Sequence, residues 1–229
     1  MTVATAKQVA IQQNNSAVSL LAAGDYDAAI SALSSALKTY YKEIMREEAD
    51  EHPEKVKTSL DQCMAQSPAA TPAKASSNEE ESDQYMYRQA IHIPLTVEFN
   101  YQASIMVSVM IIFNLALAHQ LSAVGSDKKQ SKLRKAAKLY ELSFTLERDG
   151  NFESNNILFA LATMNNLGLI HHTMNYGETA NKCFEHLLST MMVLIDCGEC
   201  NVCELDGFLR NVSNLISEHA VQQLHSVLV

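Results

Sequence analysis

The stretch Asn114-Leu115-Ala116-Leu117-Ala118-His119 returns fifty-two residues later as Asn166-Leu167-Gly168-Leu169-Ile170-His171. A weaker copy lies near the N-terminus, where Asn15-Ser16-Ala17 leads into Gly24-Asp25-Tyr26-Asp27-Ala28-Ala29-Ile30. Each copy is followed by a second segment in which alanines and apolar residues recur at helical spacing. Repetition of a helix–turn–helix unit predicts a stack of antiparallel helix pairs, because one pair cannot bury its apolar face alone.

The composition of the 229 residues agrees with an all-α fold. The chain has 47% hydrophobic residues, seven Gly, four Pro and no Trp, whereas turn-rich β architectures need more Gly and Pro. Its net charge of −9 is uneven, because residues 43–83 alone hold eleven acidic and four basic side chains. This acidic balance argues against nucleic acid as a partner.

The first twenty residues lack the unbroken apolar run of a secretory signal, and the five cysteines form an odd set. We therefore expect a reducing intracellular location, cytoplasmic or nuclear. Residues 99–126 contain no Asp, Glu, Lys or Arg and are long enough to cross a membrane. Polar residues such as Asn114 and Gln120 interrupt this stretch, and the repeat explains its apolar positions. A buried central helix is therefore the preferred interpretation, with no membrane partner.

Three segments divide the chain. Residues 1–52 predict an N-terminal helix pair, with Gly24 in the left-handed position after the first helix and Asp25 capping the second. Residues 53–83 are rich in Pro, Ala, Ser and Glu and predict a disordered acidic linker, because they cannot bury enough apolar area to offset ordering. Residues 84–222 predict further helical repeats, followed by a capping helix from about residue 206 whose polar side, including Asn211, faces solvent.

A period of two replaces the helical period between the linker and the next helix. Seven apolar residues there fall on odd positions: Tyr85, Tyr87, Ile91, Ile93, Leu95, Val97 and Phe99. Such alternation predicts an extended segment, and Pro94 keeps it out of a central sheet ladder. Because a lone strand cannot stand by itself, we expect the segment to lie against helices.

The repeated unit resembles the tetratricopeptide repeat (TPR), a 34-residue helix–turn–helix module. In residues 161–194 the signature positions are Met164, Leu167, Gly168, His171, Ala180, Phe184 and Leu187. In residues 109–150, which carry eight extra residues around the turn, they are Ile112, Leu115, Ala116, His119, Ala136, Tyr140 and Ser143. In residues 10–43 they are Gln13, Ser16, Ala17, Leu20, Ala29, Leu33 and Ala36.

The small residues among these positions are those that close helix packing requires. The resemblance implies a TPR-like α-α superhelix over about half the chain. A generic α-α superhelix outside the family is the alternative interpretation.

The resemblance also implies a peptide-binding groove. In this family an asparagine at the register of Asn15, Asn114 and Asn166 often bonds to the backbone of an extended peptide, since an amide supplies donors and an acceptor. The expected function is therefore a non-catalytic protein–protein interaction scaffold that binds a peptide or helix in its concave groove. The candidate peptide-binding residues are Asn15, Asn114, Asn166, Asn165, Leu169 and His172.

Two further expectations concern these positions. The groove positions given by the repeat register include no Lys or Arg, so a clamp for chaperone C-terminal carboxylates is not expected. Replacing Asn15, Asn114 and Asn166 by Ala is expected to weaken partner capture while leaving the melting temperature nearly unchanged. The alternative is that these amides only satisfy a neighbouring helix or solvate the groove.

A second functional hypothesis comes from the run Cys197-Gly198-Glu199-Cys200-Asn201-Val202-Cys203. Cys197, Cys200 and Cys203 suggest a metal-binding or small-molecule-dependent protein. Three thiols without a second pair fall short of a zinc or iron–sulfur motif, so no metal or cofactor is expected. His119 and His171 take the aromatic position of the repeat and are expected to pack with a bonded polar tip. We therefore expect no enzyme activity and no catalytic residues.

Overall fold

The computed structural model describes residues 3–51, 84–95, 101–149, 157–197 and 205–213. Within these ranges all regular secondary structure is helical, which confirms the predicted all-α class. The long helices are α1 (Val3–Ala22), α2 (Tyr26–Glu51), α4 (Tyr101–Leu121), α5 (Lys129–Asp149), α6 (Ile157–Thr173) and α7 (Gly177–Cys197). A short helix covers residues 206–213. The predicted linker of residues 53–83 lies outside the described residues.

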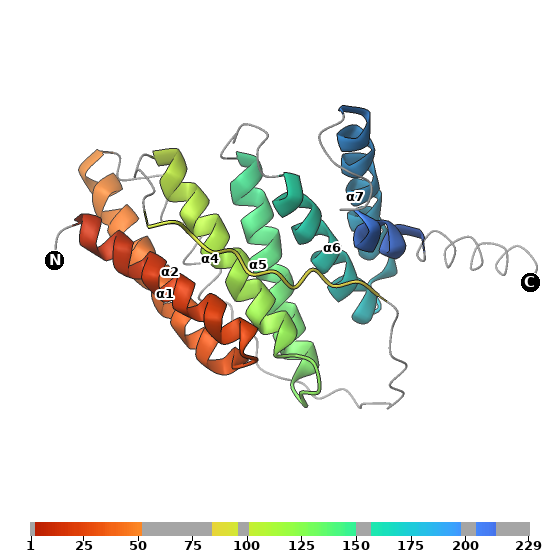
Figure 1. Ribbon diagram of the computed structural model, residues 1–229, viewed down its shortest axis with the longest axis horizontal. Coiled ribbons are helices and arrows are strands. Elements are labelled where there is room, and N and C mark those ends of the chain that lie inside the picture. The colour runs from red at the N-terminus through yellow and green to blue at the C-terminus, as the bar shows by residue number, and fades with distance from the viewer. Residues whose placement is uncertain (1–2, 52–83, 96–100, 150–156, 198–204, 214–229) are drawn as a thin grey trace, which may run out of the picture.

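The helices pack as consecutive pairs. α1 packs on α2, α4 on α5 and α6 on α7, and the pairs are joined side by side through α2 with α4 and α5 with α6 (Figure 1). Residues 84–95 form neither helix nor strand and cross this row of helices from the 206–213 helix toward α1. We call residues 84–95 the strap. The expected extended segment lying against helices is confirmed for this range.

The turn between α1 and α2 has the predicted geometry. Gly24 has a φ of +81°, a left-handed conformation that a residue with a Cβ rarely adopts. Asp25 follows it, and its Oδ1 accepts a hydrogen bond of 3.2 Å from the backbone N–H of Ala28. The carboxylate therefore caps α2 by satisfying one of the N–H groups that a helix start leaves unpaired.

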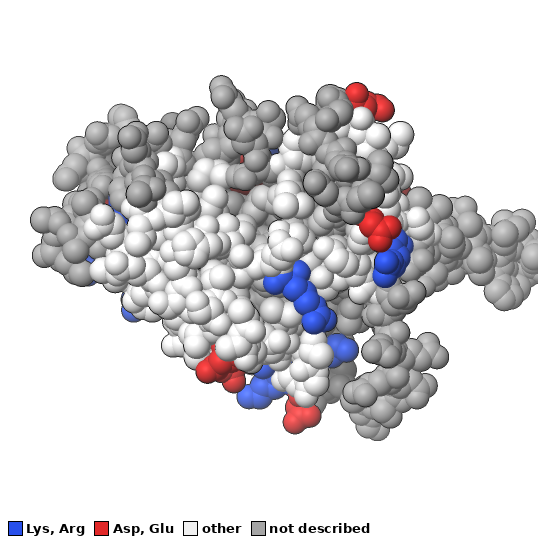
Figure 2. Space-filling model, viewed as in Figure 1, with Lys and Arg blue, Asp and Glu red and all other residues white. Residues whose placement is uncertain are grey.

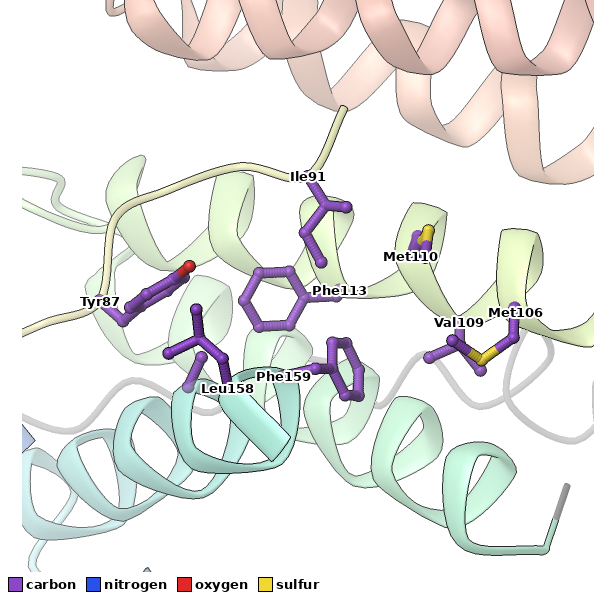
Figure 3. Close-up of a pocket in the computed structure, with 9 residues that line it drawn as sticks. Tyr87, Ile91, Met106, Val109, Met110, Phe113, Leu158 and Phe159 are labelled. Atoms are coloured by element: carbon purple, nitrogen blue, oxygen red, sulfur yellow. The ribbon is translucent and has the colours of Figure 1, made fainter. Parts of the chain in front are cut away.

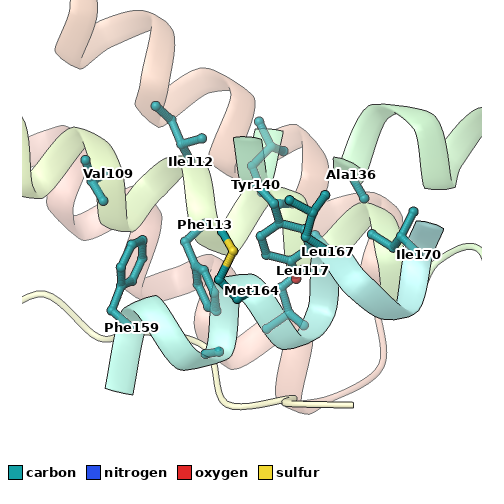
Figure 4. Packing of buried hydrophobic residues seen from close by; sticks show 14 of the residues in the cluster. Val109, Ile112, Phe113, Leu117, Ala136, Tyr140, Phe159, Met164, Leu167 and Ile170 are labelled. Carbon is teal, nitrogen blue, oxygen red and sulfur yellow. The ribbon is translucent and has the colours of Figure 1, made fainter. Parts of the chain in front are cut away.

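Small residues allow the paired helices to approach each other. A Cβ added to Gly168 of α6 would lie 2.7 Å from Cζ of Phe184 in α7, closer than real side chains come. Ala116 of α4 and Ala136 of α5 are likewise fully buried. Between these contacts lies an apolar core in which Phe113, Tyr140 and Leu167 meet from three helices (Figure 4). The sequence logic of small residues at packing positions thus corresponds to real close contacts.

The apolar helix α4 forms the centre of the stack. Its window Ala103–Leu121 has a mean hydropathy of 1.8, and by length and composition alone it is the one described helix that could cross a membrane. In the fold 72% of this window is buried. Neighbouring helices and the strap therefore cover most of its apolar surface, as expected of a central core helix.

Candidate functional site

Asn114 of α4 holds one residue of the strap by both of its backbone groups. The N–H of Ile91 donates to Asn114 Oδ1 at 2.7 Å, and Asn114 Nδ2 donates to the carbonyl oxygen of Ile91 at 2.8 Å. The amide matches an extended residue because its donor and acceptor lie side by side, as the residue's own N–H and C=O do. We call this two-bond arrangement an asparagine clasp.

Three more clasps hold the strap. Asn15 of α1 bonds to the N–H of Ile93 at 2.9 Å and to its carbonyl oxygen at 2.8 Å. Asn166 of α6 does the same with Tyr87, at 3.0 and 2.9 Å. Asn211 of the 206–213 helix bonds to the N–H of Tyr85 at 2.8 Å and to its carbonyl oxygen at 2.6 Å. The clasped residues are all odd-numbered because every second residue of an extended chain turns its polar groups to the same side.

Each half of the strap is held by a set of three asparagines. In the first set, Asn14 donates to the carbonyl oxygen of Ile91 at 3.1 Å and accepts from Asn114 Nδ2 at 2.9 Å. In the second, Asn165 donates to the carbonyl oxygen of Tyr85 at 3.0 Å and accepts from Asn211 Nδ2 at 2.6 Å. The two sets therefore have the same design. Each combines an Asn-Asn doublet, on α1 or α6, with a single asparagine on a later helix, α4 or the 206–213 helix.

Three of the four clasps are buried, those of Asn114, Asn166 and Asn211, whereas Asn15 is half-buried, so the strap and these asparagines depend on each other. Asn14, Asn114, Asn165 and Asn166 are 0% exposed. Asn166 Nδ2 also donates to Tyr140 Oη at 3.0 Å, and desolvation by full burial raises the pKa of that phenol. A buried amide or peptide group without its partner costs about 1–3 kcal/mol. Emptying this face without a replacement ligand would therefore be unfavourable.

The strap's side chains pack between the clasps. Ile93 is completely buried, whereas Tyr85 and Tyr87 are half-buried against the ring of Phe208, at centroid distances of 5.4 and 6.1 Å. Gly207 makes room for the first of these rings, because a Cβ there would lie 2.6 Å from Tyr85. The face therefore recognises apolar and aromatic side chains as well as backbone.

One stretch of the strap has no clasp. Residues 88–90 bridge from Tyr87 on α6 to Ile91 on α4, and Arg88 and Gln89 are exposed. Beside this stretch, between α4 and α6, lies an apolar cavity of about 170 Å³ (Figure 3). Its walls include the following side chains: Tyr87, Ile91, Met110, Phe113, Leu158 and Phe159.

Charge is sparse around the strap. Figure 2 shows the molecule from the same side as Figure 1, and few Lys, Arg, Asp or Glu side chains appear on the described surface. At one end of the strap, Gln84 Nε2 lies 3.1 Å from His172 Nδ1. The contacts that hold the strap are therefore amide hydrogen bonds and apolar packing rather than ion pairs.

The predicted site residues fall into two groups. Asn15, Asn114, Asn166 and Asn165 bond to the strap backbone, and His172 contacts Gln84, so the structure brings these five together along one segment. Leu169 is buried in the apolar core. Whether any of them binds a partner stays a prediction.

Sequence reasoning missed Asn14 and placed Asn211 wrongly. Asn211 was expected on the solvent side of the capping helix, but it is 1% exposed because Tyr85 and Asn165 cover it. The recurring Asn-Asn doublet, at 14–15 and again at 165–166, was the available signal for Asn14. No local pattern marks Asn211, since its partner Tyr85 is distant in sequence.

His119, His171 and Cys183 take no part in the bonds that hold the strap backbone. Burial, with help from Lys135 and Lys132, lowers the pKa of His119 to about 4. His171 Nε2 lies 3.7 Å from Glu141, and its ring nitrogens have no hydrogen-bond partner among the described residues, so the expected bonded tip is absent there. Burial raises the pKa of the Cys183 thiol to about 11, which disfavours a reactive thiolate.

The metal hypothesis falls largely on residues outside the described ranges. Cys197 ends α7, while Cys200 and Cys203 lie beyond the described part of the chain. Among the described residues no group of three or more His, Cys, Asp or Glu side chains could hold a metal ion. The hypothesis therefore stays untested.

Comparison with protein-family models, with curated proteins and with solved structures finds no match for this chain. The asparagine clasps and the strap they hold are therefore the main guide to function.

Proposed function

We propose that this chain is a non-catalytic protein-interaction module, built from TPR-like helix pairs, whose strap face binds the backbone of an extended peptide. The four clasps support this proposal most directly. Each asparagine binds the N–H and the C=O of one residue, and together they follow a backbone over nine residues, from Tyr85 to Ile93. Such a surface suits a peptide ligand because it needs only the groups that every extended chain carries.

The chemistry of the face also favours a peptide over other partners. Nucleic acid binding needs Lys and Arg side chains for phosphate contacts, whereas amides and aromatic rings surround the strap. A chaperone-type carboxylate clamp would likewise need cations, and the residues that hold the strap backbone are asparagines. The partner in this proposal is an uncharged or weakly charged extended segment of another protein.

The strap occupies the face that the partner would use. Because it belongs to the same chain, it competes as an intramolecular ligand at an effective concentration on the order of millimolar. A partner must therefore displace the strap, or bind tightly enough to exploit the fraction of molecules in which the strap is detached. The function proposed is thus a gated peptide-binding site.

A strap-released variant tests this proposal. Tyr87→Pro with Ile91→Pro removes the two N–H groups that donate to Asn166 and Asn114, and it substitutes no residue of a helix. The probe is a fluorescently labelled peptide with the sequence of residues 84–95, followed by anisotropy. We expect saturable binding to the released variant and much weaker binding to the unmodified chain.

A matched pair of variants locates the binding. Asn114→Ala in the released background should weaken the peptide at least tenfold, because two hydrogen bonds of ~1 kcal/mol each are lost. Gln12→Ala, at an exposed position of α1, should leave the affinity unchanged. If the released variant is helical by circular dichroism and yet binds no peptide up to ~1 mM, where binding is worth only ~4 kcal/mol, the proposed function is wrong.

A further inference from the structure

Backbone clasps do not distinguish one sequence from another, so selectivity at the strap face must come from side chains. The strap places apolar side chains at four alternating positions: Tyr85, Tyr87, Ile91 and Ile93. The middle position of this alternating series, between Tyr87 and Ile91, is Gln89, which is polar and exposed. The series is therefore interrupted where the clasps are also missing.

The two strap residues that flank this interruption line the cavity between α4 and α6. Tyr87 and Ile91 both line it, and residue 89 lies between them on the same side by the two-residue period of an extended chain. Gln89 does not occupy it: its Oε1 lies 3.5 Å from the phenol Oη of Tyr87, at the surface. A polar amide gains little from an apolar cavity, because burial without partners is unfavourable.

We propose that this cavity is a selectivity pocket for a large apolar side chain of a partner peptide, at the position that Gln89 takes in the strap. This inference rests on the proposed function and names its ligand class: an extended peptide with apolar residues at all five alternating positions. The volume of about 170 Å³ suits a branched aliphatic side chain or a single ring. An apolar cavity of ~150 Å³ is known to hold benzene.

The pocket also explains how a partner outcompetes a tethered segment. The strap has the advantage of attachment but leaves the pocket unfilled. A partner that buries a leucine-sized side chain there gains roughly tenfold or more in affinity, from the transfer of apolar surface out of water. The strap sequence then binds the face weakly, and it occupies the face only because its attachment to the same chain keeps its effective concentration high.

The first experiment measures the strap of the full-length chain. Amide hydrogen exchange of Tyr87 and Ile91 reports how often the strap detaches, because both N–H groups are held in clasps. In Gln89→Leu we expect their exchange to slow by roughly tenfold, whereas Gln89→Asn should leave it unchanged. Leu158→Asp, at the half-exposed rim of the cavity, should remove the gain of Gln89→Leu. Equal exchange in Gln89→Leu and Gln89→Asn would overturn the pocket assignment.

The second experiment separates this inference from the proposed function. The strap-released variant is titrated with the peptide of residues 84–95 and with the same peptide carrying Leu in place of Gln89. Tighter binding of the Leu peptide, lost in Leu158→Asp, supports the pocket. Equal binding of the two peptides overturns the pocket and leaves the proposed function standing, whereas binding of neither overturns the proposed function.

Discussion

An asparagine side chain suits the clasp because its amide places a donor and an acceptor at one short reach from the helix. Aspartate would keep the acceptor for the N–H of Ile91 and lose the donor that Asn114 gives to its carbonyl oxygen. Glutamine would reach one methylene too far and lose more side-chain entropy. The side-chain amide of Asn166 also donates to Tyr140 Oη, so this one residue connects the strap to a buried side chain of α5.

At the same scale, His119 makes the fold sensitive to acid. Its folded-state pKa of about 4 lies below the ordinary 6.5. Burial is the largest cause, because it disfavours the charged ring; the positive charges of Lys135 and Lys132 lower the pKa further, and Asp27 raises it slightly. The unfolded state therefore binds the proton more readily, and stability falls as pH drops from about 6.5 toward 4, by about 2–3 kcal/mol. We expect His119→Phe to flatten this part of the stability curve.

Urea titrations at pH 7, 5.5 and 4.5 measure the effect. The difference between pH 7 and 4.5 should shrink in His119→Phe and persist in His186→Gln, a substitution at an exposed histidine of α7. An identical pH dependence in the chain with and without His119 would show that other groups carry the acid sensitivity.

At the scale of elements, the close contact between α6 and α7 decides what Gly168 tolerates. Helix propensity alone predicts that Gly168→Ala stabilises α6 by about 1 kcal/mol. The Phe184 ring, 2.7 Å from the new Cβ, opposes this, and overpacking of a buried contact costs about 1–3 kcal/mol. We therefore expect a lower melting temperature for Gly168→Ala, by scanning calorimetry.

The chain provides its own control for this test. Gly177 begins α7, and a Cβ there meets nothing within 4 Å, so Gly177→Ala should be neutral or stabilising. Phe184→Leu should relieve part of the loss in the Gly168→Ala background by making room. A Gly168→Ala variant as stable as the unmodified chain would mean that the two helices separate freely.

Local sequence patterns predicted the elements well and their long-range contacts less well. The turn at Gly24 could be predicted because glycine favours the left-handed conformation that ends α1. The close contact at Gly168 could be predicted because a small residue recurs at that position of the repeat. The alternation of residues 85–99 likewise indicated an extended segment. That Asn15 would bond to Ile93 could not be read from either pattern, because the two residues are 78 positions apart and pairing over such separations depends on the assembled fold.

At the scale of the whole molecule, the strap connects helices that a repeat stack alone would leave independent. In such arrays each pair contacts only its neighbours, and stability is a sum of local terms. The strap bonds α1, α4, α6 and the 206–213 helix, so it ties the first pair to the end of the described stack (Figure 1). The fold should therefore unfold more cooperatively than its helix pairs would without the strap.

Loss of two central clasps tests this coupling. In Asn114→Ala with Asn166→Ala, the backbone groups of Ile91 and Tyr87 lose these partners, which should lower the free energy of unfolding by about 2–6 kcal/mol. This expectation replaces the nearly unchanged melting temperature inferred from sequence, since both asparagines are fully buried. At about 2–4 °C for each kcal/mol in a chain of this size, the melting temperature should fall by roughly 5–20 °C.

The shape of the transition matters as much as its midpoint. Urea unfolding, monitored by amide hydrogen exchange, should show α1 and α6 opening at the same urea concentration in the unmodified chain. In the double variant the two helices should open at separate urea concentrations. The apparent m-value should fall accordingly, because split transitions expose less surface at once. Gln12→Ala keeps every clasp and should retain the single transition. If the double variant unfolds in one transition at the original midpoint, the strap does not couple the ends of the stack, since coupling requires that losing its clasps change how distant helices unfold.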